Sequence, residues 1–300
     1  MKVSLLRVMI LLAAAPLVPP SAHARMAYVD AKGTVVVQDD SGKLLPQASD
    51  LSDPAISPDG KFLAATANVG DKREVRVLEI DTGNSVTLPI ESEQVFGPLW
   101  SPDGKWIALN VFSGSNWDAA LIRPDGTEFR KLIPAHPQDQ GAYVAGWNVT
   151  TGEPLVQNLD LLWQAHIDGT PASESSVEGL LGSPCISSAS RLWIRGRTLY
   201  VNRMVDDDEI PGLDGPSDYI VAVDLDNPGV RRITPVGMNA SEPFLTAKGD
   251  TILFSGFQKA DVKPGPDDAV DLTFHVMSLD LKTGEVKTVV PGGRMPSISD

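Results

Sequence analysis

The sequence predicts an all-β fold, a six-bladed β-propeller of four-stranded antiparallel blades closed by the C-terminal strand. Three observations support this prediction: an internal repeat, short strand-like runs separated by Gly, Asp and Pro turns, and a C-terminal segment that resembles the opening of a repeat. No helical periodicity is sustained after residue 25.

The repeat is clearest in two neighbouring copies. Residues 57–61 read Ser-Pro-Asp-Gly-Lys, and the same five residues return at 101–105, which is 44 residues later. In such a turn Pro fixes φ, Asp bonds its own backbone and Gly supplies a positive φ. We therefore interpret Asp59 and Asp103 as turn residues, each followed by three further strands of its blade.

Weaker copies complete the count of six. Residues 25–47 contain three strand-like runs without an inner strand before them, and residues 294–300 open like a repeat and then stop. We expect the C-terminal segment to supply the missing inner strand of the first blade. Between residues 176 and 204 the register stays open, because either half of the hairpin around Gly196 suits the second strand. The inner strands are predicted to begin near Pro54, Pro98, Val144, Pro184, Pro243 and Pro296.

The N-terminus has the pattern of an export signal. Lys2 and Arg7 precede an apolar run at 8–18, and Ala22-His23-Ala24 is a small-x-small cleavage site. We expect residues 1–24 to be a signal peptide cleaved near Ala24 and residues 25–300 to form one propeller domain, periplasmic or secreted. No later segment is long and apolar enough to span a membrane.

The net negative charge of the chain limits the classes of molecule that it is expected to bind. The chain carries a net charge of −14, and residues 1–24 hold two of the Lys and Arg and no Asp or Glu, so the remainder carries −16. This balance argues against nucleic acid and anionic membranes and is compatible with a cationic partner. Cys185 is the only cysteine, so no intrachain disulfide forms, and we interpret it as a buried apolar residue. We expect a monomer.

The Ser-Pro-Asp-Gly-Lys units, each led by a Pro or Trp strand, resemble the TolB-type, WD40-like propeller repeat. The resemblance covers the chain after the signal peptide, strongly over residues 51–134 and loosely elsewhere. It implies a six-bladed, periplasmic propeller that binds a protein partner. The α/β domain that precedes the propeller of TolB has no counterpart here, so we do not carry over a role in the Tol-Pal system.

The sequence contains no motif that indicates an enzyme. His136, His166 and His275 fall in three different units and lack the spacing of a zinc site. No G-x-S-x-G pentapeptide is present, which argues against a peptidase of the propeller type. We leave catalytic residues unassigned and regard a non-enzymatic role as the better interpretation.

Two acidic insertions are the most informative irregularities. They lie at 206–218 and 259–268, and both are predicted to join the second and third strands of neighbouring blades, so that they share one rim. We predict that this rim contacts a partner, and the alternatives are a Ca²⁺ site, which lacks EF-hand spacing, and two solvated loops. The candidate residues are Asp206, Asp207, Asp208, Glu209, Asp214, Asp261, Asp267 and Asp268.

The sequence thus predicts a binding or scaffold propeller that presents a loop-rich, acidic face to a protein or peptide. The alternative is a propeller hydrolase or lyase that acts on a carbohydrate or a small ester at the central channel. A cluster of His, Arg and carboxylate groups in that channel would favour the enzyme, and no cofactor is expected for either function.

Overall fold

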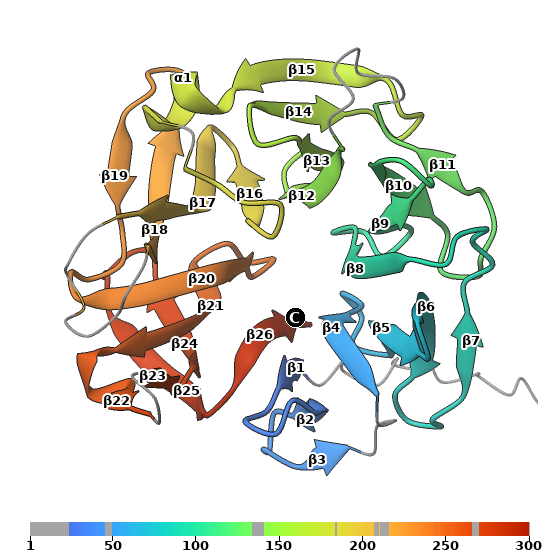
Figure 1. The fold of residues 1–300 in the computed structure, drawn as a ribbon, viewed down its shortest axis with the longest axis horizontal. Coiled ribbons are helices and arrows are strands. Elements are labelled where there is room, and N and C mark those ends of the chain that lie inside the picture. Colours follow the sequence, from blue (N-terminus) through green and yellow to red (C-terminus); the bar gives the residue numbers. More distant parts are fainter. Residues whose placement is uncertain are drawn as a thin grey trace, which may run out of the picture.

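A computed structural model shows small antiparallel sheets arranged around a centre, as in a propeller (Figure 1). The described part of the chain contains one short α-helix, α1 (Val177–Leu181), and one 3₁₀ turn, η1 (Lys259–Asp261). None of its helices is long and apolar enough to cross a bilayer. The structure describes residues 24–45, 50–133, 141–183, 185–206, 210, 216–265 and 270–299.

Four sheets stand alone, each with four antiparallel strands. The first has the order β26-β1-β2-β3, the second β4-β5-β6-β7, the third β8-β9-β10-β11 and the last β20-β21-β24-β25. Their strands are β1 (Arg25–Val29), β2 (Val35–Asp39), β3 (Leu44–Leu45), β4 (Leu51–Ile56), β5 (Phe62–Val69), β6 (Lys72–Glu79), β7 (Ser85–Thr87), β8 (Val95–Trp100), β9 (Ile107–Phe112), β10 (Trp117–Ile122), β11 (Arg130–Lys131), β20 (Met238–Leu245), β21 (Thr251–Gln258), β24 (His275–Asp280), β25 (Val286–Pro291) and β26 (Arg294–Ile298).

The rest of the ring is one eight-stranded sheet, here called the joined sheet, with the order β15-β14-β13-β12-β16-β17-β18-β19. The prediction of six separate blades is therefore wrong: four four-stranded blades are separate. A small hairpin, β22 (Val262–Pro264) and β23 (Val270–Leu272), lies apart from the sheets. The strands of the joined sheet are β12 (Tyr143–Asn148), β13 (Glu153–Gln157), β14 (Leu161–Ala165), β15 (Pro171–Ser176), β16 (Leu192–Arg195), β17 (Thr198–Val205), β18 (Ser217–Asp224) and β19 (Val230–Arg232).

A glycine explains why two sheets have merged. β12 and β16 run parallel and pair in register, with Gly146 opposite Leu192 and Trp147 opposite Trp193. A Cβ atom at position 146 would overlap the carbonyl oxygen of Leu192. Because only glycine permits so close an approach of two backbones, the pairing depends on this residue.

The fourth inner strand also departs from the prediction. β16 begins at Leu192 and not near Pro184, a residue that lies outside the described part of the chain. Between β15 and β16 the chain forms α1, where the Ser176 hydroxyl accepts a hydrogen bond from Gly179 N and Gly182 ends the helix in the left-handed conformation. β17 is the second strand, which resolves the open register.

The repeated turns fold as the sequence predicts. The Ser57 hydroxyl donates to Asp59 Oδ1 at 2.6 Å and accepts from Phe62 N at 2.9 Å, and Gly60 has a φ of 70°. The second copy makes the same two bonds through Ser101, at 2.7 and 2.9 Å. Both serines are buried, so the turns are part of the packed structure.

Apolar side chains fill the spaces between neighbouring sheets. One cluster joins the second and third sheets and includes Ile107 and Leu109, both fully buried. Tryptophans add hydrogen bonds across these spaces: Trp100 Nε1 donates to Ala55 O, and Trp193 Nε1 donates to Pro243 O. Such contacts hold each sheet at a fixed angle to the next.

The C-terminal strand belongs to the first sheet. β26 pairs antiparallel with β1, with Met26 opposite Ile298 and Ala27 opposite Ser297. Ser297 also connects the first sheet to the second, because its hydroxyl accepts a hydrogen bond from Ile56 N at 2.9 Å. Segments from the two ends of the chain thus lie side by side in one sheet.

Candidate functional site

The predicted acidic rim is only partly visible. Both insertions do join second and third strands, β17 to β18 and β21 to β24. Asp206 and Asp261 are described, whereas Asp207, Asp208, Glu209, Asp214, Asp267 and Asp268 lie outside the described residues. The proposal that the two loops share a rim therefore remains a prediction.

Asp261 has a local structural task. Its Oδ2 accepts a hydrogen bond from Gln258 N at 2.9 Å, and its Oδ1 lies 3.1 Å from His275 Nε2. Burial acts to raise the pKa of Asp261, but the bonds from Gln258 and His275 outweigh it, so the pKa is lowered. Across the described ranges no three His, Cys, Asp or Glu side chains gather as a metal would need.

The other singled-out residues stay apart from one another. His166 Nδ1 lies 3.0 Å from Oε1 of Glu153, a residue of the joined sheet, and His275 belongs to a different sheet, in β24. His136 is outside the described residues. Cys185 is buried, as predicted. These residues do not come together into one site.

The structure instead brings charged residues together at the centre of the ring, and we call this set the channel cluster: Asp53, Arg191 and Glu242. All three line one cavity of about 40 Å³, together with Pro54, Pro98 and Met295. Asp53 comes from β4, Glu242 from β20, and Arg191 immediately precedes β16. Three sheets thus contribute one charged side chain each.

A repeated backbone irregularity includes two of these residues, Asp53 and Glu242. Each of four inner strands contains a left-handed residue immediately before a proline: Asp53, Gly97, Glu242 and Met295, with φ between 49° and 67°. At each of these residues the register of the strand pair shifts. Positive φ is unfavourable for the three residues that are not glycine, and such strain is typical of functional positions.

Arg191 is the central cation of the cluster. Among the described residues its guanidinium makes no direct hydrogen bond or ion pair, and Asp53 and Glu242 act on it at longer range. Burial lowers the pKa of Arg191, while the two carboxylates oppose the shift. Because arginine stays protonated in proteins, the channel contains a charged group whose donors are free for a ligand or water.

Glu242 is held by a hydrogen-bond chain. Burial raises its pKa, against the opposing effects of a bond from Ser255 and the charges of Arg191 and Arg294. Ser255 Oγ donates to Glu242 Oε2 at 2.6 Å and accepts from Met295 N at 2.7 Å. Ser255 is fully buried, so its hydroxyl fixes the carboxylate and is not exposed as a nucleophile.

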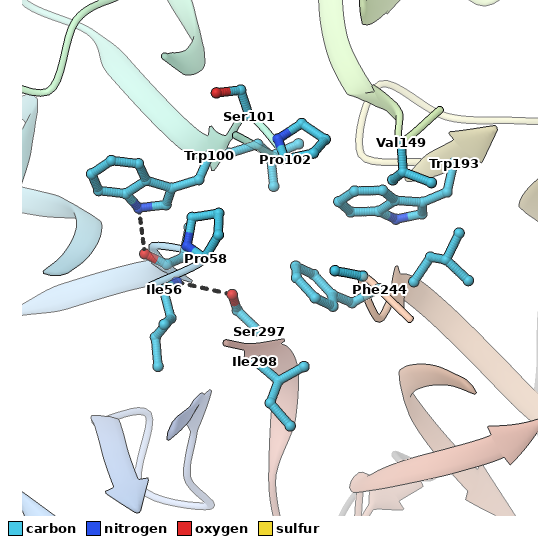
Figure 2. Close-up of a pocket in the computed structure, with 14 residues that line it drawn as sticks. Ile56, Pro58, Trp100, Ser101, Pro102, Val149, Trp193, Phe244, Ser297 and Ile298 are labelled. Atoms are coloured by element: carbon cyan, nitrogen blue, oxygen red, sulfur yellow. Dashed lines mark hydrogen bonds between the residues drawn. The ribbon is translucent and has the colours of Figure 1, made fainter. Parts of the chain in front are cut away.

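A second, apolar cavity of about 50 Å³ adjoins the cavity of the channel cluster. Leu99, Phe244 and Ser297 line both cavities. Figure 2 shows Trp193 and Phe244 on one side and Trp100 and Pro58 on the other. It lies where the inner strands end, at the side of the ring that carries the repeated turns. The channel is thus apolar at one end and charged further in.

Sequence reasoning missed the channel cluster. The signal was present, because Asp53 and Glu242 are the only acidic residues that precede a proline at the predicted start of an inner strand. The prolines themselves indicated only where the inner strands begin. The position of Arg191 depended on the register of the joined sheet, which the sequence left open.

Comparison with known proteins supports the fold. No known protein family and no curated protein matches the sequence. Among solved structures, a putative TolB from Agrobacterium tumefaciens is similar with a TM-score of 0.58 and 18% identity, over 91% of each chain. Hydrazine synthase from Kuenenia stuttgartiensis has a TM-score of 0.57 and 11% identity, over 93% of this chain and 47% of that one.

The β-propeller domain of the Trilobed protease from Pyrococcus furiosus is similar with a TM-score of 0.53 and 12% identity, over 86% of this chain and 90% of that domain. These neighbours include a TolB and a domain of a protease, so a shared architecture accompanies different activities. At such low identity the comparisons show the β-propeller fold alone.

Proposed function

We propose that the protein is an exported binding propeller that captures a segment of a protein or peptide partner at its central channel. Each half of the joined sheet serves as one blade, so that six units surround the channel and the pairing of β26 with β1 closes the ring. Residues 1–24 act as the cleaved export signal and place the protein in the periplasm or outside the cell. The domain acts as a monomer.

The small volume of the two channel cavities is the observation that supports this proposal. These cavities, of about 40 and 50 Å³, are far smaller than the roughly 300–1,000 Å³ of a typical small-molecule site. A space of this size accepts the end of one side chain, and the free donors of Arg191 provide a polar partner for it. A side chain that fills such a pocket gives a protein interface a well-packed anchor.

The partner approaches from the side where the inner strands begin. The loops that follow β17 and β21 also leave the sheets on that side. We propose that their acidic residues, with Asp206 and Asp261 among the described ones, give this face a negative potential that steers basic residues of the partner toward it.

Site-specific cross-linking tests the proposal. A photoreactive amino acid is placed at Asp206 or Lys259 on the loop side, at Pro102 on the opposite side, and at Val86 on an outer strand. We expect one polypeptide to cross-link from 206 and 259 in envelope fractions, and the variant lacking residues 206–216 to lose it. Equal labelling from Val86, or capture that survives the deletion, would contradict the proposal.

One observation favours the alternative function. The channel cluster is the gathering of Arg and carboxylate groups that an enzyme at the channel would require, although it contains no histidine among the described residues. Turnover of chromogenic esters or glycosides that disappears in Glu242→Gln, while the variant stays folded, would establish the hydrolase and replace the binding proposal.

A further inference from the structure

A larger cavity lies between the first and last sheets, separate from the channel. It has a volume of about 420 Å³, which is within the range of small-molecule sites. Its walls come from the β1–β2 turn, the segment after β23 and the turn before β26. Its lining residues include Asp30, Ala31, Leu272, Phe274, Gly292 and Arg294. We call this cavity the side groove.

Arg294 supplies a positive charge that has no direct partner. Its side chain is exposed, and within the described ranges it makes neither a hydrogen bond nor an ion pair, although its charge acts at longer range on the buried Glu242 carboxylate. The protein as a whole is strongly acidic, with a net charge of −14. A concave surface that keeps an unpaired guanidinium in such a protein is suited to bind a carboxylate, which accepts two parallel N–H bonds from arginine.

Asp30 supplies a free carboxylate oxygen in the same groove. Its Oδ1 accepts hydrogen bonds from Lys32 N and Thr34 N, both at 2.9 Å, and these bonds fix the β1–β2 turn. No bond to its other oxygen is found in the described part of the chain. The turn thus holds one carboxylate oxygen in place for a ligand donor, such as an ammonium group.

The wall between these charges is apolar. Leu272 is 37% exposed, and Phe274 packs edge-on against the buried Phe257 with ring centroids 5.0 Å apart. The floor is small, because Gly292 has no side chain and a Cβ there would already touch Ala31 at 3.4 Å. The groove therefore offers an apolar surface beside two opposite charges.

We propose that the side groove binds a zwitterionic ligand with an apolar side chain, either a free amino acid or a short peptide. The carboxylate of the ligand pairs with Arg294, its ammonium group pairs with Asp30, and its side chain packs on Leu272 and Phe274. Exposed ion pairs contribute little individually, so all three contacts are needed for measurable affinity. This proposal does not rest on partner binding at the channel, although Arg294 also acts on Glu242 in the channel cluster.

Calorimetric titration of the purified protein tests the ligand class. The probes are L-leucine, L-phenylalanine and leucyl-leucine, with leucinamide and 4-methylpentanoate as analogues that each lack one charge. We expect at least one zwitterion to bind, and each analogue to bind at least tenfold more weakly. Preference for leucyl-leucine over leucine identifies a peptide site, and the reverse identifies an amino-acid site. No binding of any zwitterion at millimolar concentration overturns the proposal.

Variants test the two contacts. Arg294→Gln removes the cation, and Asp30→Asn removes the charge while its amide oxygen still accepts the turn bonds. We expect each to weaken the zwitterion at least tenfold. Asp30→Asn should leave the unfolding temperature of the unliganded protein unchanged, whereas Arg294→Gln should lower it slightly, because the charge of Arg294 acts on the buried Glu242. Lys32→Gln changes a charge beside the groove and is the matched control, with affinity within twofold. Equal affinity in all three variants would show that the ligand binds elsewhere.

Discussion

The second and third sheets differ from the joined sheet in how the chain separates its units. In β4–β11 the turn after each inner strand is Ser-Pro-Asp-Gly, and the inner strands of the two sheets do not pair with each other. Apolar side chains fill the space between these sheets, and one isolated backbone bridge joins Arg73 of β6 to Gln94 before β8. In β12–β19 the motif is absent, and two inner strands pair through their backbones. The comparison indicates that side chains between inner strands keep blades apart, and that a single glycine removes this separation.

The two regions form the turn after the inner strand with different residues. Ser101 bonds Asp103 and the backbone of Trp106, whereas Asn148 alone accepts from Thr150 N and Thr151 N at 3.0 and 3.2 Å. An Asn side chain can form this turn without help, which explains why the turn forms here although the motif is absent. The joined sheet also has an unfavourable feature, because Trp147 Nε1 is buried without a partner in the described structure.

The largest effect is expected for Gly146→Val. The new side chain would overlap Leu192 O, so the β12–β16 pairing must break and the free energy of unfolding should fall by more than about 4 kcal/mol. Urea unfolding followed by tryptophan fluorescence measures the loss.

Gly229→Ala is the control for that substitution, because its Cβ would have only Asn227 O as a neighbour, at 3.7 Å. We expect a change within about 0.5 kcal/mol. If Gly146→Val is as stable as this control, the glycine explanation of the joined sheet fails.

Intermediate effects are expected in the repeated turns. Ser57→Ala and Ser101→Ala each remove a buried hydroxyl that makes two hydrogen bonds, at a cost of about 1–3 kcal/mol. The two losses should agree closely, because the two turns have the same bonds. A large difference between them in urea unfolding would show that the copies are not structurally equivalent.

The smallest effects concern the pH dependence of the free energy of unfolding, which has opposite signs for a carboxylate in each of the two regions. Burial acts to raise the pKa of Asp103, but bonds from Ser101 and Lys105 outweigh it, so the pKa is lowered. The ionised carboxylate therefore stabilises the fold above about pH 4 and loses that effect as the pH falls through the lowered pKa. Burial raises the pKa of Asp218, against a bond from Asn202, so ionised Asp218 destabilises the fold as the pH rises above about 4.

We therefore expect Asp103→Asn to lower stability at pH 7 and Asp218→Asn to raise it, each by about 1 kcal/mol or less. Both differences should shrink toward pH 3. Urea unfolding at pH 3, 5 and 7 measures them, and a difference of the same sign for both variants at pH 7 would show that the two environments are not opposite.

The sequence was sufficient for the four separate sheets, but not for the joined sheet or for the site. Turn chemistry at Ser57–Gly60 is local, so a five-residue repeat predicted it together with the strands on either side. The pairing of β26 with β1 followed from the resemblance of the last residues to a repeat opening. The merger at Gly146 depends on how closely two distant strands approach, which no local pattern encodes.

The channel cluster was missed for the same reason. Asp53, Arg191 and Glu242 are up to 189 positions apart, and only the ring brings them to one cavity. The acidic insertions can be recognised from the sequence because their charged residues are contiguous. Contiguity in sequence is visible without a structure, whereas convergence in space is not.

The arrangement in a ring requires that the C-terminal strand pairs with the first strand of the domain, and an engineered cysteine pair is the sharpest test of that pairing. Met26 and Ile298 lie opposite each other in β1 and β26, within the distance that a disulfide spans. In a Cys185→Ser background, Met26→Cys with Ile298→Cys should oxidise readily and give a faster-migrating band on a non-reducing gel. Met26→Cys with Val86→Cys, on an outer strand, should not. Free thiols in the first pair under oxidation, or equal bridging in both pairs, would contradict the closed ring.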